Sequence, residues 1–157
     1  MWQALQNSSW VVTLNTTHWM FETISVLHYF TLFIFVGMTA MLDLRILGVA
    51  GKQQKAAELS QQLLPWSWLF LILALVTGFL EFSTTAADYA AVWPFRVKII
   101  IVLVAMVFAI VVQINIGKWE REPAMPGSAK FWAFLSLLFW IGAILAGVEV
   151  APLTGLG

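Results

Sequence analysis

The sequence contains no cysteine and only two histidines among its 157 residues. The absence of cysteine excludes disulfides, thiolate-bound zinc, iron–sulfur clusters and thiol catalysis. Because His18 and His28 are the only histidines, a metal or haem site would have few nitrogen ligands available. The chain also lacks a phosphate-binding loop, a dinucleotide-binding glycine motif and an H-E-x-x-H motif. Nothing in the sequence therefore predicts a self-sufficient enzyme, and we assign no catalytic residue.

Charged residues are scarce as well: they make up 10% of the chain and balance to a net charge of zero, whereas 61% of the residues are hydrophobic. Soluble domains are about 25% charged and about 45–50% apolar. A chain of this size could not hide so much apolar surface in its own core, but lipid can cover it. The composition predicts an integral membrane protein in contact with the lipid bilayer, and the neutral charge predicts no nucleic-acid partner.

Four continuous apolar segments are long enough to cross a bilayer, since a helix needs about 20 residues to span a hydrocarbon core of about 30 Å. None shows the strand alternation of a β-barrel. We predict an all-α bundle of four transmembrane helices, forming one domain over residues 1–157. The spans cover residues 21–47, 64–82, 95–116 and 131–148. Tryptophans near the span ends predict an aromatic belt: Trp19, Trp66, Trp68, Trp93, Trp119 and Trp132. Trp140 lies mid-span and is expected inside the bundle.

The basic residues predict the orientation of the chain. Most of them fall in the two loops after the first and third spans, and cytoplasmic loops are rich in Lys and Arg. Both termini are therefore expected outside, in the periplasm, if the host membrane is a bacterial inner membrane. The loop residues are Arg45, Lys52, Lys55, Lys118, Arg121 and Lys130, against Arg96 and Lys98 on the other side.

Two further segments and a set of small residues complete the predicted architecture. Residues 2–14 mix apolar and polar side chains and carry no Lys or Arg, so we expect a retained outer interfacial helix rather than a cleaved signal; a loosely ordered terminus is the alternative. Residues 51–62 predict an amphipathic helix along the inner surface. Small residues four apart allow close helix contacts, within one chain or between chains: Ala74/Gly78, Ala105/Ala109, Gly142/Ala146 and Ala143/Gly147.

Polar residues gather near the outer ends of all four predicted helices. Two interpretations stay open. The acids can pair with Arg96 and Lys98 at the lipid–water boundary, because charges within a span are costly and need partners. Alternatively, the groups line an outward pocket for a small ligand, a quinone headgroup or a cofactor edge. The candidate ligand-binding residues are His28, Glu22, Ser25, Tyr29 and Arg96, and the surrounding outer polar cluster is His18, Glu81, Asp88, Tyr89, Lys98 and Glu149.

His28 is the most informative of these residues. It can hydrogen-bond a neighbouring group, ligate haem iron or bond a quinone carbonyl. Haem b held by two histidines needs the second one across the ring, but His18 lies about 15 Å away along the same helix. Haem b within one chain would then require a methionine or another subunit as the second ligand. Haem b and quinone remain alternative cofactors, and no other metal is assigned.

Asp43 and Arg45 close the first span at its inner end. Asp43 lies at or near membrane depth and needs a partner, while Arg45, two residues on, points elsewhere on the helix. Gln113 and Asn115, at the inner end of the third span, are the expected neighbours of Asp43. We interpret Asp43 as a packing lock between helices rather than as part of a proton relay.

Several runs resemble an uncharacterised bacterial family of four-helix inner-membrane proteins. They are ETISVLHYFTLFIFVGMTAMLDLRILG (residues 22–48), LLPWSW (63–68), ADY (87–89) and FRVK (95–98). The resemblance spans about residues 10–148 and implies fold and topology, but no activity. Relatives often carry a histidine near the inner end of the third helix, where this chain has Gln113 and Asn115, which weakens a haem assignment.

These observations lead to three functional hypotheses. The first is a non-catalytic membrane subunit that anchors or assembles with a larger, redox complex or with further copies of itself, through the small residues of the last helix and the outer polar cluster. The second is a small b-type cytochrome or quinone-interacting electron-transfer protein centred on His28. The third is an oligomeric small-solute transporter, although the spans lack the broken helices typical of transporter sites.

Overall fold

The computed structural model describes the backbone of residues 1–51 and 53–154, and the side chains of these residues apart from His18 and residues 148–154. Over this part of the chain the protein is all helical, and four of its helices are long and apolar enough to cross a membrane. The helices are α1 (Trp2–Gln6), α2 (Ser9–Thr16), α3 (His18–Leu47), α4 (Ala56–Thr84), α5 (Ala86–Ala91), α6 (Trp93–Trp119) and α7 (Gly127–Thr154). The prediction of a four-helix membrane bundle is confirmed.

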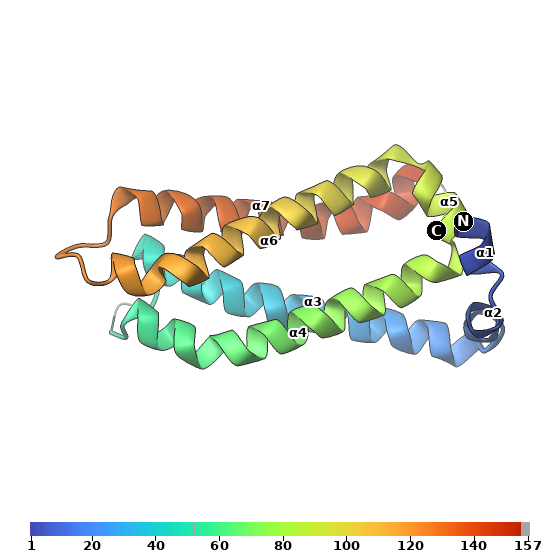
Figure 1. Ribbon diagram of the computed structural model, residues 1–157, viewed down its shortest axis with the longest axis horizontal. Coiled ribbons are helices and arrows are strands. Elements are labelled where there is room, and N and C mark those ends of the chain that lie inside the picture. The colour runs from blue at the N-terminus through green and yellow to red at the C-terminus, as the bar shows by residue number, and fades with distance from the viewer. Residues whose placement is uncertain (52, 155–157) are drawn as a thin grey trace.

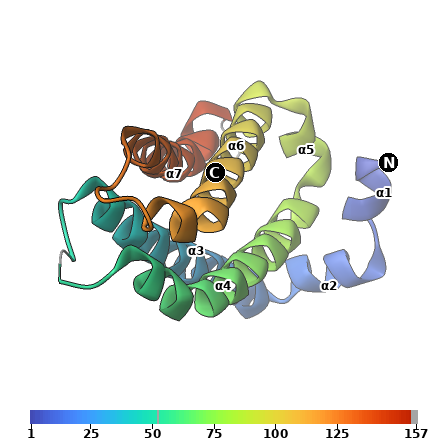
Figure 2. The same cartoon turned by 60° about the vertical axis from the view of Figure 1, so that its left-hand side comes forward.

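The long helices form two antiparallel hairpins (Figure 1). Helix α3 packs along α4, and α6 packs along α7. The hairpins meet mainly through α3 and α7, whereas α4 and α6 touch over a much shorter stretch. The line between α4 and α6 is therefore less tightly packed than the side formed by α3 and α7, and the two helices diverge along it toward α5 (Figure 2). We call this line the α4–α6 seam.

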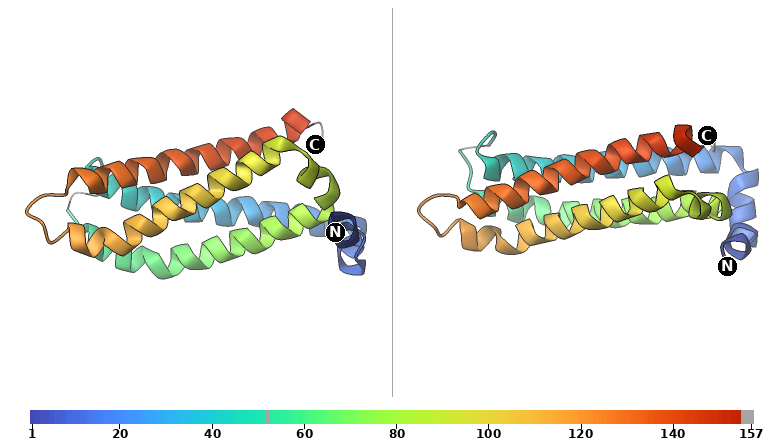
Figure 3. Two further views of the ribbon diagram at one scale, coloured as in Figure 1. Left: turned by 45° about the horizontal axis from the view of Figure 1, so that its top comes forward. Right: turned by 90° about the horizontal axis from the view of Figure 1, so that it is seen from above.

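The two ends of the bundle differ. One end, which we call the terminal end, carries the N-terminus, α1, α2, α5 and the last turns of α7 (Figure 1). The other, the loop end, carries the connections 48–55 and 120–126. At the terminal end, α1 and α2 lie across the bundle instead of continuing along it (Figure 3). Val11 and Leu14 of α2 are buried, so this segment is packed against the bundle.

Two features close the loop end. One is a glycine in a backbone conformation that other residues rarely adopt, and the other is an acidic side chain that caps a helix. Helix α3 ends at Gly48, whose φ of 77° is left-handed, the conformation that favours glycine after a helix. Helix α4 begins at Ala56, and the Glu120 carboxylate accepts hydrogen bonds from the N–H groups of Ala56 (2.7 Å) and Ala57 (2.8 Å). An acidic side chain at a helix N-terminus pairs with unsatisfied donors and with the positive end of the helix dipole.

Two apolar clusters hold the bundle together. The first, near the loop end, joins all four long helices, and the second lies in the middle of the bundle around Trp140. Trp140 is 1% exposed, and its ring meets Phe35 edge-on at 4.7 Å. Its predicted place inside the bundle is confirmed. The loop-end cluster comprises Leu42, Ile46, Ala56, Leu59, Val112, Ile116, Trp119, Ala129 and Ala133.

The structure departs from the predicted spans at α4. This helix starts at Ala56, so Pro65 lies well inside it instead of near its start. Residues 56–62 belong to the same continuous helix and not to a separate surface helix. Proline is tolerated within transmembrane helices, which explains why it did not end this one. Trp119, predicted in the aromatic belt, is instead buried in the loop-end cluster, whereas Trp19 and Trp93 are exposed as expected.

Candidate functional site

His28 lies inside the terminal half of the bundle, between α3 and α4. Its Nδ1 atom lies 2.9 Å from the carbonyl oxygen of Ala74 and 3.2 Å from the Thr77 hydroxyl. The ring rests on Gly78, where an added Cβ would meet the imidazole Cε1 atom at 2.7 Å. Gly78 thus makes room for the ring, and His28 serves as a contact between two helices.

Two charged side chains approach His28 from neighbouring helices. Glu81 of α4 and Lys98 of α6 are close enough for their charges to act on the imidazole and on each other. Lys98 is half-buried, and the end of its side chain lies against Gly147 of α7. We call His28, Glu81 and Lys98 the polar triad. Its members come from α3, α4 and α6, and their charges act on one another.

Of the remaining candidate ligand-binding residues, Tyr29 lies beside His28, with 5.8 Å between the ring centroids. Glu22, Tyr29 and Arg96 are exposed, and Ser25 is half-buried. The Arg96 guanidinium donates to the carbonyl oxygen of Ala90 through Nε (3.1 Å) and Nη2 (3.0 Å), so it closes the turn between α5 and α6. On α3, Glu22 and Tyr29 are exposed, whereas His28 faces α4.

The outer polar cluster is similarly divided. Tyr89 stacks edge-on against Phe95 at 5.7 Å, and Asp88 is exposed on α5. Burial raises the pKa of the Tyr89 phenol, and the nearby Tyr29 and Glu81 raise it further. Tyr89 therefore stays neutral and able to donate a hydrogen bond at neutral pH. The side chains of His18 and Glu149 lie outside the described residues.

Asp43 occupies a different place, one helical turn before the end of α3 and near the loop end. It is 0% exposed, and Ser136 of α7 faces the same carboxyl group. Neither carboxylate oxygen, however, has a hydrogen bond, and neither does the Ser136 hydroxyl. Gln113 lies nearby as predicted, but Asn115 donates to Val111 on its own helix (2.8 Å). Asp43 is buried between α3 and α7, and its role as a packing lock between helices stays a prediction.

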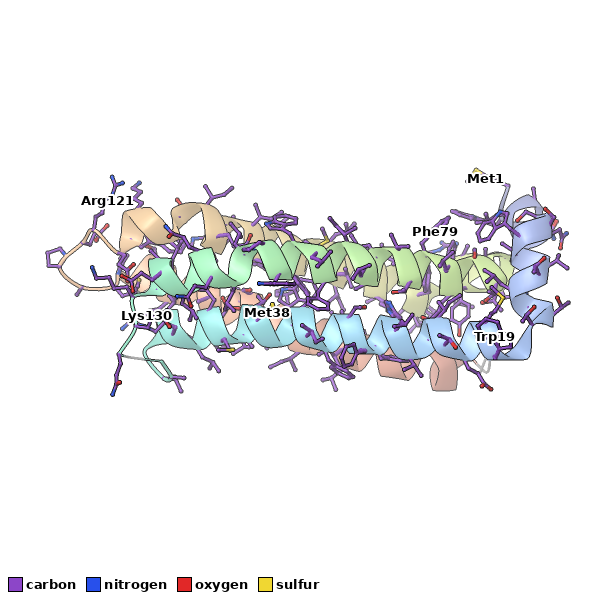
Figure 4. All side chains as sticks on the ribbon, turned by 90° about the horizontal axis from the view of Figure 1, so that it is seen from below. Met1, Trp19, Met38, Phe79, Arg121 and Lys130 are labelled. Carbon is purple, nitrogen blue, oxygen red and sulfur yellow. The ribbon has the colours of Figure 1, made fainter. Side chains whose placement is uncertain are left out.

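A narrow crevice runs along the α4–α6 seam and ends at Asp43. Helices α4 and α6 form its walls and α3 its floor. Figure 4 labels Met38, a floor residue, between α3 and α4. The space accommodates about one water molecule. Its polar lining side chains are Thr39, Asp43, Ser60, Ser67 and Gln113, and the half-exposed or exposed side chains at its mouth are Trp68, Met106 and Ile110.

Several of these residues were not singled out from the sequence. Ser136 and Ser67 are isolated hydroxyls in apolar runs, and serine is common in membrane helices, so only their position beside Asp43 distinguishes them. Glu120 belongs to a polar loop in which every charged residue looks solvated. Arg45, the other structural candidate, donates through Nε to the carbonyl oxygen of Gln54 and so holds the loop after α3.

The described side chains offer few ligands for a metal or haem. Among the described residues, no three His, Cys, Asp or Glu side chains come together as metal ligands. Helix α3 is continuous from His18 to Leu47, which keeps the two histidines about 15 Å apart along its axis. The chain matches no family model, no curated protein and no solved structure. Its resemblance to the uncharacterised inner-membrane family therefore stays a prediction.

Proposed function

We propose that this chain is a non-catalytic integral membrane subunit that packs against a transmembrane helix of a larger complex along the α4–α6 seam. The observation that carries the proposal is a half-buried amide on the seam. Gln113 lies toward the loop end of α6, within a span where lipid offers no hydrogen bonds, whereas the buried Ser67 hydroxyl beside it donates to the carbonyl oxygen of Leu64 (3.0 Å). Polar groups within a membrane face other protein or a water-filled cavity, so a neighbouring helix accounts for Gln113.

The α4–α6 seam is also a better candidate for the partner-binding surface than α7. The small residues of α7 are used within the chain: Gly142 faces Ile101 of α6 and Gly147 faces Lys98, while Ala143 is buried in the central cluster. The polar triad likewise joins helices of this chain. The small-residue face of α7 is therefore occupied within the chain, whereas α4 presents the exposed Trp68 at the seam.

The location proposed for this subunit is a bacterial inner membrane, with the terminal end outside. Described basic side chains concentrate at the loop end, where Arg121 lies in the connection between α6 and α7 and Lys130 in the first turn of α7 (Figure 4). Cytoplasmic loops carry such an excess of Lys and Arg. With an even number of spans, both ends of the described chain lie on the opposite side.

His28 is the residue from which we propose that the partner complex is a redox complex. The same residue is the basis of the alternative, a small cytochrome or quinone-interacting protein. His28 already contacts Ala74, Thr77 and Gly78. Because α3 is continuous, His18 of the same chain is too far along the helix to ligate the same haem iron. A haem ligand set would need a second chain. An absorption spectrum of the gently solubilised protein, before and after reduction, tests this alternative: reduced α and β bands that disappear in His28→Ala would favour the cytochrome.

Crosslinking in native membranes tests the subunit proposal. Because the chain has no cysteine, a single cysteine carrying a photoreactive group can be placed at Trp68 on the seam. Matched probes at Val26 of α3 and Leu145 of α7, which are 68% and 60% exposed on other faces, serve as controls. We expect a discrete adduct from position 68 alone, with a different integral membrane protein identified by mass spectrometry.

The same experiment can contradict the proposal. Equal adducts from all three positions, or none from position 68, would remove the seam as a partner surface. An adduct of twice the chain's mass would identify a second copy of this chain as the occupant and would overturn the assignment to a larger complex.

A further inference from the structure

The carboxyl group of Asp43 is the least satisfied polar group in the described interior. It is fully buried, both of its oxygens lack a hydrogen bond, and the facing Ser136 hydroxyl is unpartnered too. A bare carboxylate in such surroundings is strongly disfavoured, and buried charges are neutralised or paired. The group therefore requires a positive charge that the packing of this chain does not itself provide.

The charge cannot come from the neighbouring side chains. The elements around Asp43 present Thr39 on α3, Ser60 and Ser67 on α4, Gln113 on α6 and Ser136 on α7. None of these ionises in the physiological range. Of the side chains that line the crevice, Asp43 alone carries a charge, and one negative charge is balanced by one monovalent cation.

An ion would reach Asp43 from the side of the bundle and not from either end. Toward the loop end, the buried side chains of Ile46, Leu59 and Trp119 close the bundle. Toward the terminal end, Phe35, Leu71 and Trp140 close it. Asp43 lines the crevice along the α4–α6 seam, which has room for about one water molecule, hence for a small ion; because the residue is 0% exposed, access to its carboxyl group requires α4 and α6 to separate transiently.

We propose that Asp43 is a binding site for one monovalent cation, a proton or an alkali-metal ion, which reaches it laterally through the crevice between α4 and α6. Hydroxyl and amide oxygens along the crevice supply further oxygen ligands, which suit hard cations. When occupied, the site is electrically neutral within the membrane. The inference goes beyond a subunit role and concerns the isolated chain, so it can fail while the subunit proposal stands, and the reverse.

Carbodiimide labelling of the purified, folded protein tests the site. These reagents add the O–H of a protonated carboxyl group across a C=N bond, and the adduct is located by peptide mass spectrometry. We expect lipophilic dicyclohexylcarbodiimide to label Asp43, whereas a water-soluble carbodiimide labels the exposed Glu58 and leaves Asp43 unmodified. Asp43→Asn removes the label at this position.

Two variations of the labelling experiment, one in pH and one in salt, identify the cation. If a proton occupies the site, labelling falls as pH rises and is indifferent to salt. If an alkali-metal ion occupies it, sodium or lithium chloride protects Asp43 at constant pH, whereas choline chloride does not. Labelling that responds to neither pH nor salt would overturn the proposal.

A variant that leaves Asp43 in place keeps the test independent of how well Asp43→Asn folds. Ala109 is 5% exposed and lines the crevice, so Ala109→Leu narrows it. We expect Ala109→Leu to lose most of the labelling, and Val107→Leu, on the lipid-exposed face of the same helix, to keep it. Absence of Asp43 labelling in the folded native chain, or equal labelling by the water-soluble reagent, would also overturn the proposal.

Discussion

The helices are held together by different kinds of contact at the two ends of this bundle. At the loop end and in the middle, large apolar side chains fill the space between helices, and Glu120 caps α4. At the terminal end, the ionisable side chains His28, Glu81 and Lys98 come from neighbouring helices, and α1 and α2 lie across this end of the bundle (Figure 3). The loop end is thus held by apolar burial, whereas the terminal end depends on polar contacts and on a covering segment.

This difference separates residues that hold the fold from residues available for function. Apolar packing tolerates little change in volume, so the loop-end half is rigid by construction. Polar contacts between helices in membranes contribute modestly, about 0.6 kcal/mol on average in measured cases. The terminal end is therefore expected to open first, and variants placed in each half should differ in cost.

The largest effect is expected from Trp140→Ala in the central apolar cluster. The ring is 1% exposed and packs on Phe35, so its removal leaves a cavity that costs about 3–5 kcal/mol. Unfolding in mixed detergent micelles, followed by circular dichroism, measures the change in free energy. Trp93→Ala removes an equally large ring that is 69% exposed and should cost far less. Equal costs for the two variants would contradict the placement of Trp140.

Gly78→Ala tests the polar half. The new methyl group would meet the His28 ring at 2.7 Å, so the ring must leave its place beside Ala74, at a cost of about 1–3 kcal/mol. Gly37→Ala is the matched control, because its added Cβ meets nothing within 4 Å. In a double-mutant cycle, His28→Ala should relieve part of the Gly78→Ala penalty. Strict additivity would show that the two residues do not touch.

Glu120→Ala tests the cap at the loop end. Its loss leaves the N–H groups of Ala56 and Ala57 without their partner and should cost about 1–2 kcal/mol. Hydrogen exchange at these two amides should accelerate together with the fall in stability. Glu122→Ala, two residues away and exposed, should change stability by less than about 0.5 kcal/mol. Protection of both amides in Glu120→Ala would rule the cap out.

Gln6→Ala tests the covering segment and should have the smallest effect. The Gln6 side-chain oxygen accepts a hydrogen bond from the Ala87 N–H at 2.9 Å, and losing one such bond costs about 1 kcal/mol. Faster hydrogen exchange confined to α5 is the expected signature, with exposed Gln3→Ala as the control. Unchanged exchange at Ala87 in Gln6→Ala would mean that α1 does not hold α5.

The sequence predicted the parts of the fold that depend on composition and length. Apolar runs of about 20 residues decide where helices span, so the four spans were predictable. The extent of α4 was not, because Pro65 ends helices in water but is tolerated in membranes. Whether the Trp119 side chain is buried depends on which face of α6 packs against the other helices, and no local sequence pattern shows that.

The candidate site was less predictable, because it depends on how α3, α4 and α6 meet. His28 and Asp43 stood out as ionisable residues within a span, and both prove to lie inside the bundle. Their neighbours did not stand out: Gly78 and Ser136 are common residue types whose importance comes only from contact. Arg96 looked like a partner for the acids, but it closes its own turn at Ala90.

Membrane topology is the most direct test of the account, which places the two unlike ends on opposite sides of the membrane. Single cysteines at Gln3 and Asp88, both exposed at the terminal end, and at Gln53 and Glu122, exposed at the loop end, can be probed with a membrane-impermeant maleimide in intact cells. The account predicts that positions 3 and 88 react at once, and that positions 53 and 122 react only after permeabilisation. Reaction of positions 3 and 53 from the same side would contradict it.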